Sequence, residues 1–74
     1  MIPEFSQVIL AVDLPDKLLQ KGDVGVVVQS FEEGNGYAVE FFKLDGSTFT
    51  EATVSANQIL IAGKNHLLHV RELV

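Results

Sequence analysis

An all-β fold is predicted by three features of this sequence. Residues 21–28 (KGDVGVVV) lead from a glycine turn directly into β-branched residues, which favour strands. No helix-length apolar pattern follows them. The pair Asp45-Gly46 stands between two segments of alternating polarity, which is a strong hairpin signal. Gly25 leaves one strand position without a side chain, which permits a bend or a close approach of another backbone.

The length allows one small domain. A chain of 74 residues buries only about 60% of its unfolded surface on folding. It contains no cysteine, so its stability must come from a well-filled β core, with oligomerisation as a further source. No apolar run approaches the roughly 18 residues that span a bilayer. The N-terminus lacks the basic segment of a secretory signal, so we expect a cytoplasmic protein without membrane contact.

The apolar periodicity divides the chain into short strands joined by turns. Pro15 ends the first strand because it has no N–H to donate, and we expect Leu18 or Leu19 to cover one end of the core. Ser55 and Gln58 match a capping box, which predicts a single 3₁₀ turn. The predicted strands are 7–14, 24–31, 37–42, 47–54 and 59–62. Tyr37, Val39 and Phe41 share one face of the third strand.

This order of elements resembles the SH3-like barrel. Residues 13–23 take the place of its long first loop, 34–36 match its second loop, and 45–46 match its distal hairpin. The resemblance implies a small barrel of five antiparallel strands, or six if the tail forms a strand, with one 3₁₀ turn. We therefore divide the chain into a barrel over residues 1–62 and a C-terminal extension over 63–74, which is either an extra strand or a docking arm.

The sequence also resembles a family of short uncharacterised bacterial domains that is common in cyanobacteria. The elements that carry the resemblance lie at 12–15, 22–25, 37–41, 45–46 and 58–59, within residues 7–62. Genes of this family often stand beside genes for small toxin-like proteins, which implies an antitoxin or immunity role. The chain departs from the family pattern at Leu60-Ile61 and from Gly63 onward.

The charge of the chain disfavours nucleic acid as a ligand. Ten acidic residues oppose five basic ones, which gives a net charge of −5. Binding to a phosphate backbone draws on clustered lysine and arginine, so the negative charge of this chain opposes nucleic-acid binding. The alternative is kept because residues 22–27 resemble the start of the KOW motif, whose domains bind RNA or ribonucleoproteins. A groove for proline-rich peptides is not expected, since the chain has no tryptophan and one tyrosine.

Catalytic and metal chemistry find little support in the sequence. His66 and His69 are the two histidines, and two imidazoles do not complete a zinc site. The neighbouring carboxylates, Asp13 with Asp16 and Glu32 with Glu33, lie in predicted turns, where solvated charge is the usual outcome. We therefore expect no enzyme activity, no metal and no cofactor.

A protein partner is the remaining interpretation. Acidic loops could cover a basic toxin and speed the encounter with it. The tail could complete a homo-oligomer or dock on a partner, which also leaves open a structural subunit of a larger complex. The candidate partner-binding residues are Asp16, Asp23, Glu32, Glu33 and Asp45 in the loops, and Leu67, Val70 and Leu73 in the tail.

Overall fold

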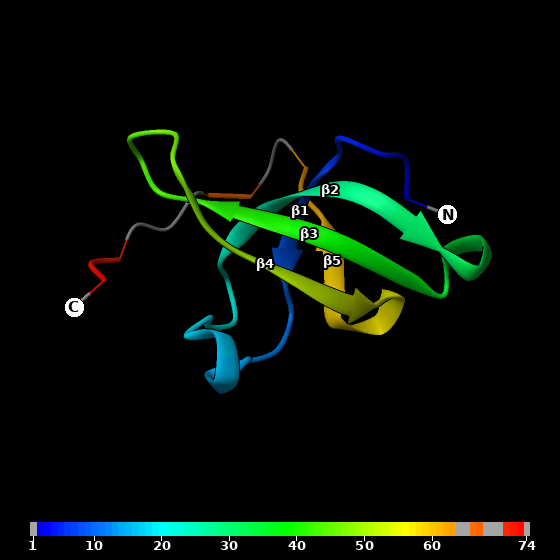
Figure 1. The fold of residues 1–74 in the computed structure, drawn as a ribbon, viewed down its shortest axis with the longest axis horizontal. Helices are drawn as coiled ribbons and strands as arrows, with labels where there is room; N and C mark the ends of the chain where they lie inside the picture. Colours follow the sequence, from blue (N-terminus) through cyan, green and yellow to red (C-terminus); the bar gives the residue numbers. More distant parts are fainter. Residues whose placement is uncertain (1, 64–65, 68–70, 74) are drawn as a thin grey trace.

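Five antiparallel strands form one sheet in the computed structural model, which describes residues 2–63, 66–67 and 71–73 (Figure 1). The order across the sheet is β4-β3-β2-β1-β5, with every neighbouring pair antiparallel. The predicted all-β class is confirmed. The elements are β1 (Gln7–Leu10), η1 (Pro15–Lys17), β2 (Val24–Phe31), η2 (Glu32–Gly34), β3 (Gly36–Phe42), β4 (Thr48–Ser55), η3 (Ala56–Gln58) and β5 (Ile59–Ile61), where η marks a 3₁₀ turn.

The predicted 3₁₀ turn is η3, between β4 and β5. Two further 3₁₀ turns, η1 and η2, precede β2 and β3. The backbone N–H of Ser55 donates to Oε1 of Gln58 at 2.8 Å, as a capping box requires. Among the described residues of the tail, none lies in a strand or helix. In the whole described part of the chain, no helix is long and apolar enough to cross a membrane.

The first strand is shorter than predicted. It ends at Leu10 rather than Leu14, because the following residues fold into a closed loop. Leu14 and Leu19 form an isolated bridge, with the N–H of each donating to the carbonyl of the other. This bridge turns Leu19 into the core, whereas Leu18 has a φ of 59° and is exposed. Leu19 is thus the leucine that covers the end of the core.

The core lies on one face of the strongly curved sheet. The predicted shared face of Tyr37, Val39 and Phe41 is confirmed, since all three side chains are buried. Burial of such side chains contributes about 1.5–3 kcal/mol each. Tyr37 also accepts a hydrogen bond from the backbone N–H of Ile2 to its hydroxyl, at 2.9 Å. The other core residues are Val8, Leu10, Leu19, Val27, Ala52, Val54 and Ile59.

Gly25 allows the backbones of β2 and β3 to approach each other closely. A Cβ at this position would lie 2.6 Å from Cγ1 of Val39 and 2.8 Å from the carbonyl oxygen of Glu40. Both distances are shorter than van der Waals contact, so β2 and β3 can curve together only because residue 25 lacks a side chain.

A β-bulge shapes the hairpin between β3 and β4. Phe41 pairs with Thr50 while Phe42 pairs with Thr48, so Phe49 is the additional residue on β4. Phe49 packs against the core, whereas Phe42 points to the opposite face of the sheet and is 45% exposed. The bulge therefore sends two neighbouring aromatic rings to the two faces of one hairpin.

Candidate partner-binding groove

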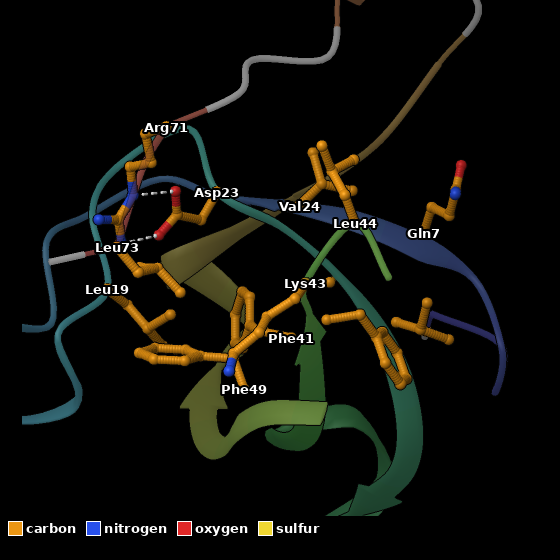
Figure 2. Close-up of a pocket in the computed structure, with 13 residues that line it drawn as sticks. Gln7, Leu19, Asp23, Val24, Phe41, Lys43, Leu44, Phe49, Arg71 and Leu73 are labelled. Carbon is orange, nitrogen blue, oxygen red and sulfur yellow. Dashed lines mark hydrogen bonds and ion pairs between the residues drawn. The ribbon is translucent and has the colours of Figure 1, made fainter. Parts of the chain in front are cut away.

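An apolar groove of about 600 Å³ lies between the start of β2, the β3–β4 hairpin and the tail (Figure 2). We call it the hairpin groove. Leu44, at the tip of the hairpin, is 89% exposed, and Figure 2 shows it on the same side as Val24. At the other end, Leu73 of the tail lies near Leu19 and Phe49. The remaining apolar residues that line the groove are Gly25, Val26, Phe41 and Phe42.

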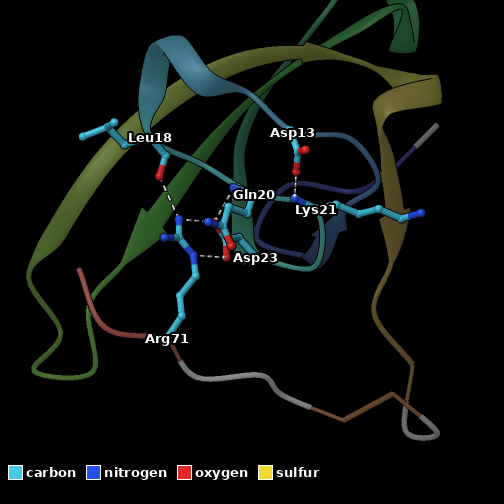
Figure 3. Close-up of polar contacts among 6 residues, drawn as sticks. All are labelled: Asp13, Leu18, Gln20, Lys21, Asp23 and Arg71. Atoms are coloured by element: carbon cyan, nitrogen blue, oxygen red, sulfur yellow. Dashed lines mark hydrogen bonds and ion pairs between the residues drawn. The ribbon is translucent and has the colours of Figure 1, made fainter. Parts of the chain in front are cut away.

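The tail reaches the groove through an ion pair. Nε of Arg71 donates to Oδ1 of Asp23 at 2.9 Å, and Nη2 donates to Oδ2 at 2.8 Å (Figure 3). Nη2 also donates to the carbonyl oxygen of Leu18 at 2.7 Å. The hydrogen bonds that Arg71 donates to the Asp23 carboxylate raise the pKa of Arg71 above its usual value. The two-point geometry fixes the orientation of the guanidinium as well as its position.

The loop over residues 13–23 is held by its own carboxylates. Oδ2 of Asp23 accepts a hydrogen bond from the backbone N–H of Gln20 at 2.8 Å, and Oδ1 of Asp13 accepts one from the N–H of Lys21 at 2.8 Å. Figure 3 shows both bonds around the contact with Arg71. Asp23 therefore both closes this loop and anchors the tail, which gives it an intramolecular role besides the predicted one at a partner.

The other acidic candidates do not gather in one place. Glu32 and Glu33 lie in η2, at the start of β3, with φ angles of 49° and 56°. Asp45 lies in the turn that follows β3, at the other end of that strand (Figure 1). Asp16 lies in η1, on the loop before β2. The described carboxylates thus surround the domain rather than form one acidic surface.

Asp45 has a local role in the hairpin turn. Its Oδ1 accepts hydrogen bonds from the hydroxyl of Ser47 at 2.6 Å and from the N–H of the same residue at 2.9 Å. These bonds, that of the hydroxyl foremost, hold the pKa of Asp45 below its usual value. The turn chemistry read from Asp45-Gly46 is confirmed, since Gly46 has a φ of 87°.

The tail candidates have different environments. Leu73 lines the hairpin groove and is 39% exposed, while Leu67 is 95% exposed. Val70 lies outside the described residues. Among the described tail candidates, Leu73 is therefore the one that lies at the hairpin groove.

The histidine pair can be followed only at His66. Its Nδ1 accepts a hydrogen bond from the N–H of Gly63 at 2.8 Å, which closes a turn after β5. His69 lies outside the described residues. Within the described part of the chain, no three side chains of the metal-binding types lie close enough together to hold an ion.

The sequence did not single out the hairpin side of the groove. Phe42 and Leu44 are apolar residues beside a turn that otherwise contains Lys43, Asp45 and Gly46. The sequence feature that could have indicated a binding surface here is the presence of two large apolar side chains at a polar turn. Their place in a groove depends on the bulge and on the tail, which strand periodicity does not reveal.

Residues 4–61 match a protein family described as a domain of unknown function, DUF4926. The chain belongs to this family. The DUF4926 match includes all five described strands and the hairpin side of the groove, and it ends before Arg71 and Leu73. Comparison with curated proteins found no match, and comparison with solved structures found none either.

Proposed function

We propose that this DUF4926 domain is a protein-interaction module that receives its partner at the hairpin groove. The observation that carries the proposal is the exposure of Phe42 and Leu44 at the rim of this groove. Large apolar side chains grouped beside a concave surface are typical of protein-binding sites. The strand order, with η3 between β4 and β5, supports an SH3-like barrel as the scaffold.

The partner proposed here is a basic, toxin-like protein that the domain neutralises. The net charge of −5 favours attraction to a positively charged surface and fast, salt-sensitive association. In this role the domain acts in the cytoplasm as an antitoxin or immunity protein and carries out no reaction. Covering a partner's active site needs contact area and attraction: the groove supplies the area, and the net negative charge of the whole chain supplies the attraction.

Co-expression with the protein encoded beside it in the genome tests this proposal. We expect a complex that survives size-exclusion chromatography, and we expect Phe42→Ser and Leu44→Ser to weaken it by about tenfold or more. The matched control is Phe5→Ser, because Phe5 is 76% exposed and lies outside the groove lining. The proposal fails if no complex forms, or if the control weakens the complex as much as the groove variants do.

A further inference from the structure

We propose that the outer face of the sheet binds a partner segment that carries a cationic side chain next to apolar ones. This inference rests on the proposed function, because Val24 and Phe42 of the outer face also line the hairpin groove, and it names the chemistry of the partner segment. The outer face is the side of the sheet that faces away from the core. Its two relevant rows are an apolar row of Leu60, Ile9, Val24 and Phe42, and an adjacent row of Gln7, Val26, Glu40 and Glu51.

The apolar row crosses four strands. Ile9 lies directly opposite Leu60 on β5 and directly opposite Val24 on β2. Phe42 continues the row on β3, because the preceding Phe41 pairs with Gly25, the residue after Val24. Leu60 is 55% exposed, and Ile9 and Val24 are only partly buried. The sheet therefore offers a continuous apolar strip that the described residues leave partly exposed.

Two carboxylates stand beside this strip. Glu40 on β3 and Glu51 on β4 are directly opposite each other in the register. Like charges in this position destabilise a sheet. The hydroxyl of Thr48 donates to Oε2 of Glu40 at 3.0 Å, which confirms that Glu40 points to the outer face with Thr48 and Phe42. Within the described ranges, neither carboxylate forms an ion pair.

The spacing of the two rows fits one partner segment. Rows on one face of a sheet lie two residues apart along each strand, which is about 6.5–7 Å. A segment whose apolar side chains lie on the strip can therefore place a neighbouring lysine or arginine between Glu40 and Glu51. The cation would replace repulsion by two charge-assisted hydrogen bonds. The apolar strip and the carboxylate pair are separate observations, and both point to the same segment.

The test uses the full chain and two short synthetic peptides. In one peptide each leucine is followed two positions later by lysine and in the other by glutamate, so that both side chains lie on one face of an extended segment. We expect the lysine peptide to shift the NMR signals of Ile9, Val24, Phe42 and Leu60, and the glutamate peptide to leave them unchanged. The double variant Glu40→Gln/Glu51→Gln should weaken binding of the lysine peptide by about tenfold or more. It should also raise the melting temperature, because the repulsion is removed.

The matched control is Glu32→Gln/Glu33→Gln, which removes the same charge from η2 at the far end of β3. These two glutamates are partner-binding candidates from the sequence, but they lie outside the two rows that the inferred segment contacts. We expect this control to change the affinity for the lysine peptide by less than about twofold, because charges that lie far from the bound peptide are largely screened by salt. Equal weakening by both double variants would overturn the inference, as would equal binding of the two peptides or signals that shift only around Leu19 and Phe49. None of these results decides whether the neighbouring gene's product binds, so the proposed function is judged separately.

Discussion

The guanidinium of Arg71 donates to both carboxylate oxygens of Asp23, a residue 48 positions earlier in the chain. The side chains are 24% and 12% exposed, so solvent screens the pair only in part. This contact brings Leu73 to the hairpin groove and joins the tail to the loop before β2. Among the described residues, the Arg71–Asp23 ion pair thus joins the tail to the groove.

Replacing the two members of this pair should have unequal effects. Arg71→Ala removes only the contact with the tail, whereas Asp23→Ala also removes the acceptor for the N–H of Gln20. We expect Asp23→Ala to lower the free energy of unfolding by about 1–3 kcal/mol and Arg71→Ala to lower it less. Urea denaturation of the two single variants and the double variant measures both effects and their coupling. A larger loss for Arg71→Ala would contradict the loop role of Asp23.

Deleting residues 63–74 should leave the five-stranded sheet folded. The buried core residues that the structure describes all lie between Val8 and Ile59, and the backbone bond from Ala62 to Gln7 is kept. We expect cooperative unfolding to persist and binding of a hydrophobic dye to increase, because Leu73 no longer covers its end of the groove. Arg71→Ala in the full chain is the control, and it should reproduce part of the dye response. An unfolded truncated chain would show instead that the tail belongs to the core.

Most of the fold can be predicted from the sequence, because strands and turns have local sequence patterns. Alternation placed Tyr37, Val39 and Phe41 on one face, and the turn residues at 45–46 located the hairpin. The prediction for the first strand is wrong beyond Leu10. The alternation of apolar residues continues to Leu14, but the bridge from Leu14 to Leu19 closes a loop there. Whether such a segment joins the sheet depends on its tertiary contacts, which alternation alone does not reveal.

The groove was less accessible because it depends on contacts between distant residues. The sequence predicts Asp23 as a loop carboxylate that binds a partner, and only the fold shows that Arg71 reaches it. The pairing of Glu40 with Glu51 likewise depends on the register of β3 and β4. Register follows from turn geometry and bulges, which strand periodicity alone does not give.

The hydrogen bonds of Asp45 predict an acid sensitivity of the hairpin. Because its pKa in the folded chain is below the usual 3.8, the bonds to Ser47 stabilise the fold above that pH. This contribution is lost as the pH falls through the folded-state pKa. Ser47→Ala removes the strongest cause of the shift, so the pKa of Asp45 should rise toward its usual value. An NMR titration of the Asp45 carboxyl carbon measures this, and an unchanged midpoint would contradict the hydrogen-bond assignment.

The hydroxyl of Tyr37 should anchor the N-terminal segment. It accepts the N–H of Ile2 at 2.9 Å, and Ile2 packs against the core. Tyr37→Phe keeps the ring and removes this acceptor, so we expect a loss of about 0.5–1.5 kcal/mol in the free energy of unfolding. Hydrogen exchange at Ile2 should accelerate while exchange at Val39 follows only the global change. Unchanged protection of Ile2 would show that packing alone holds this segment.

Adding one methyl group at each of two strand glycines should separate steric exclusion from glycine's flexibility. Gly25→Ala places a Cβ 2.6 Å from Cγ1 of Val39 and 2.8 Å from a backbone carbonyl oxygen, so strands β2 and β3 must move apart. We expect a loss of about 1–3 kcal/mol or more in the free energy of unfolding. Gly36→Ala is the matched control, since its nearest new neighbour is the carbonyl oxygen of Val54 at 3.8 Å, an ordinary contact. That substitution should be neutral or stabilise by about 0.4–1 kcal/mol, because it reduces the freedom of the unfolded chain. Thermal denaturation of both variants measures the difference, and equal losses would mean that the close approach at Gly25 does not limit the packing of the two strands.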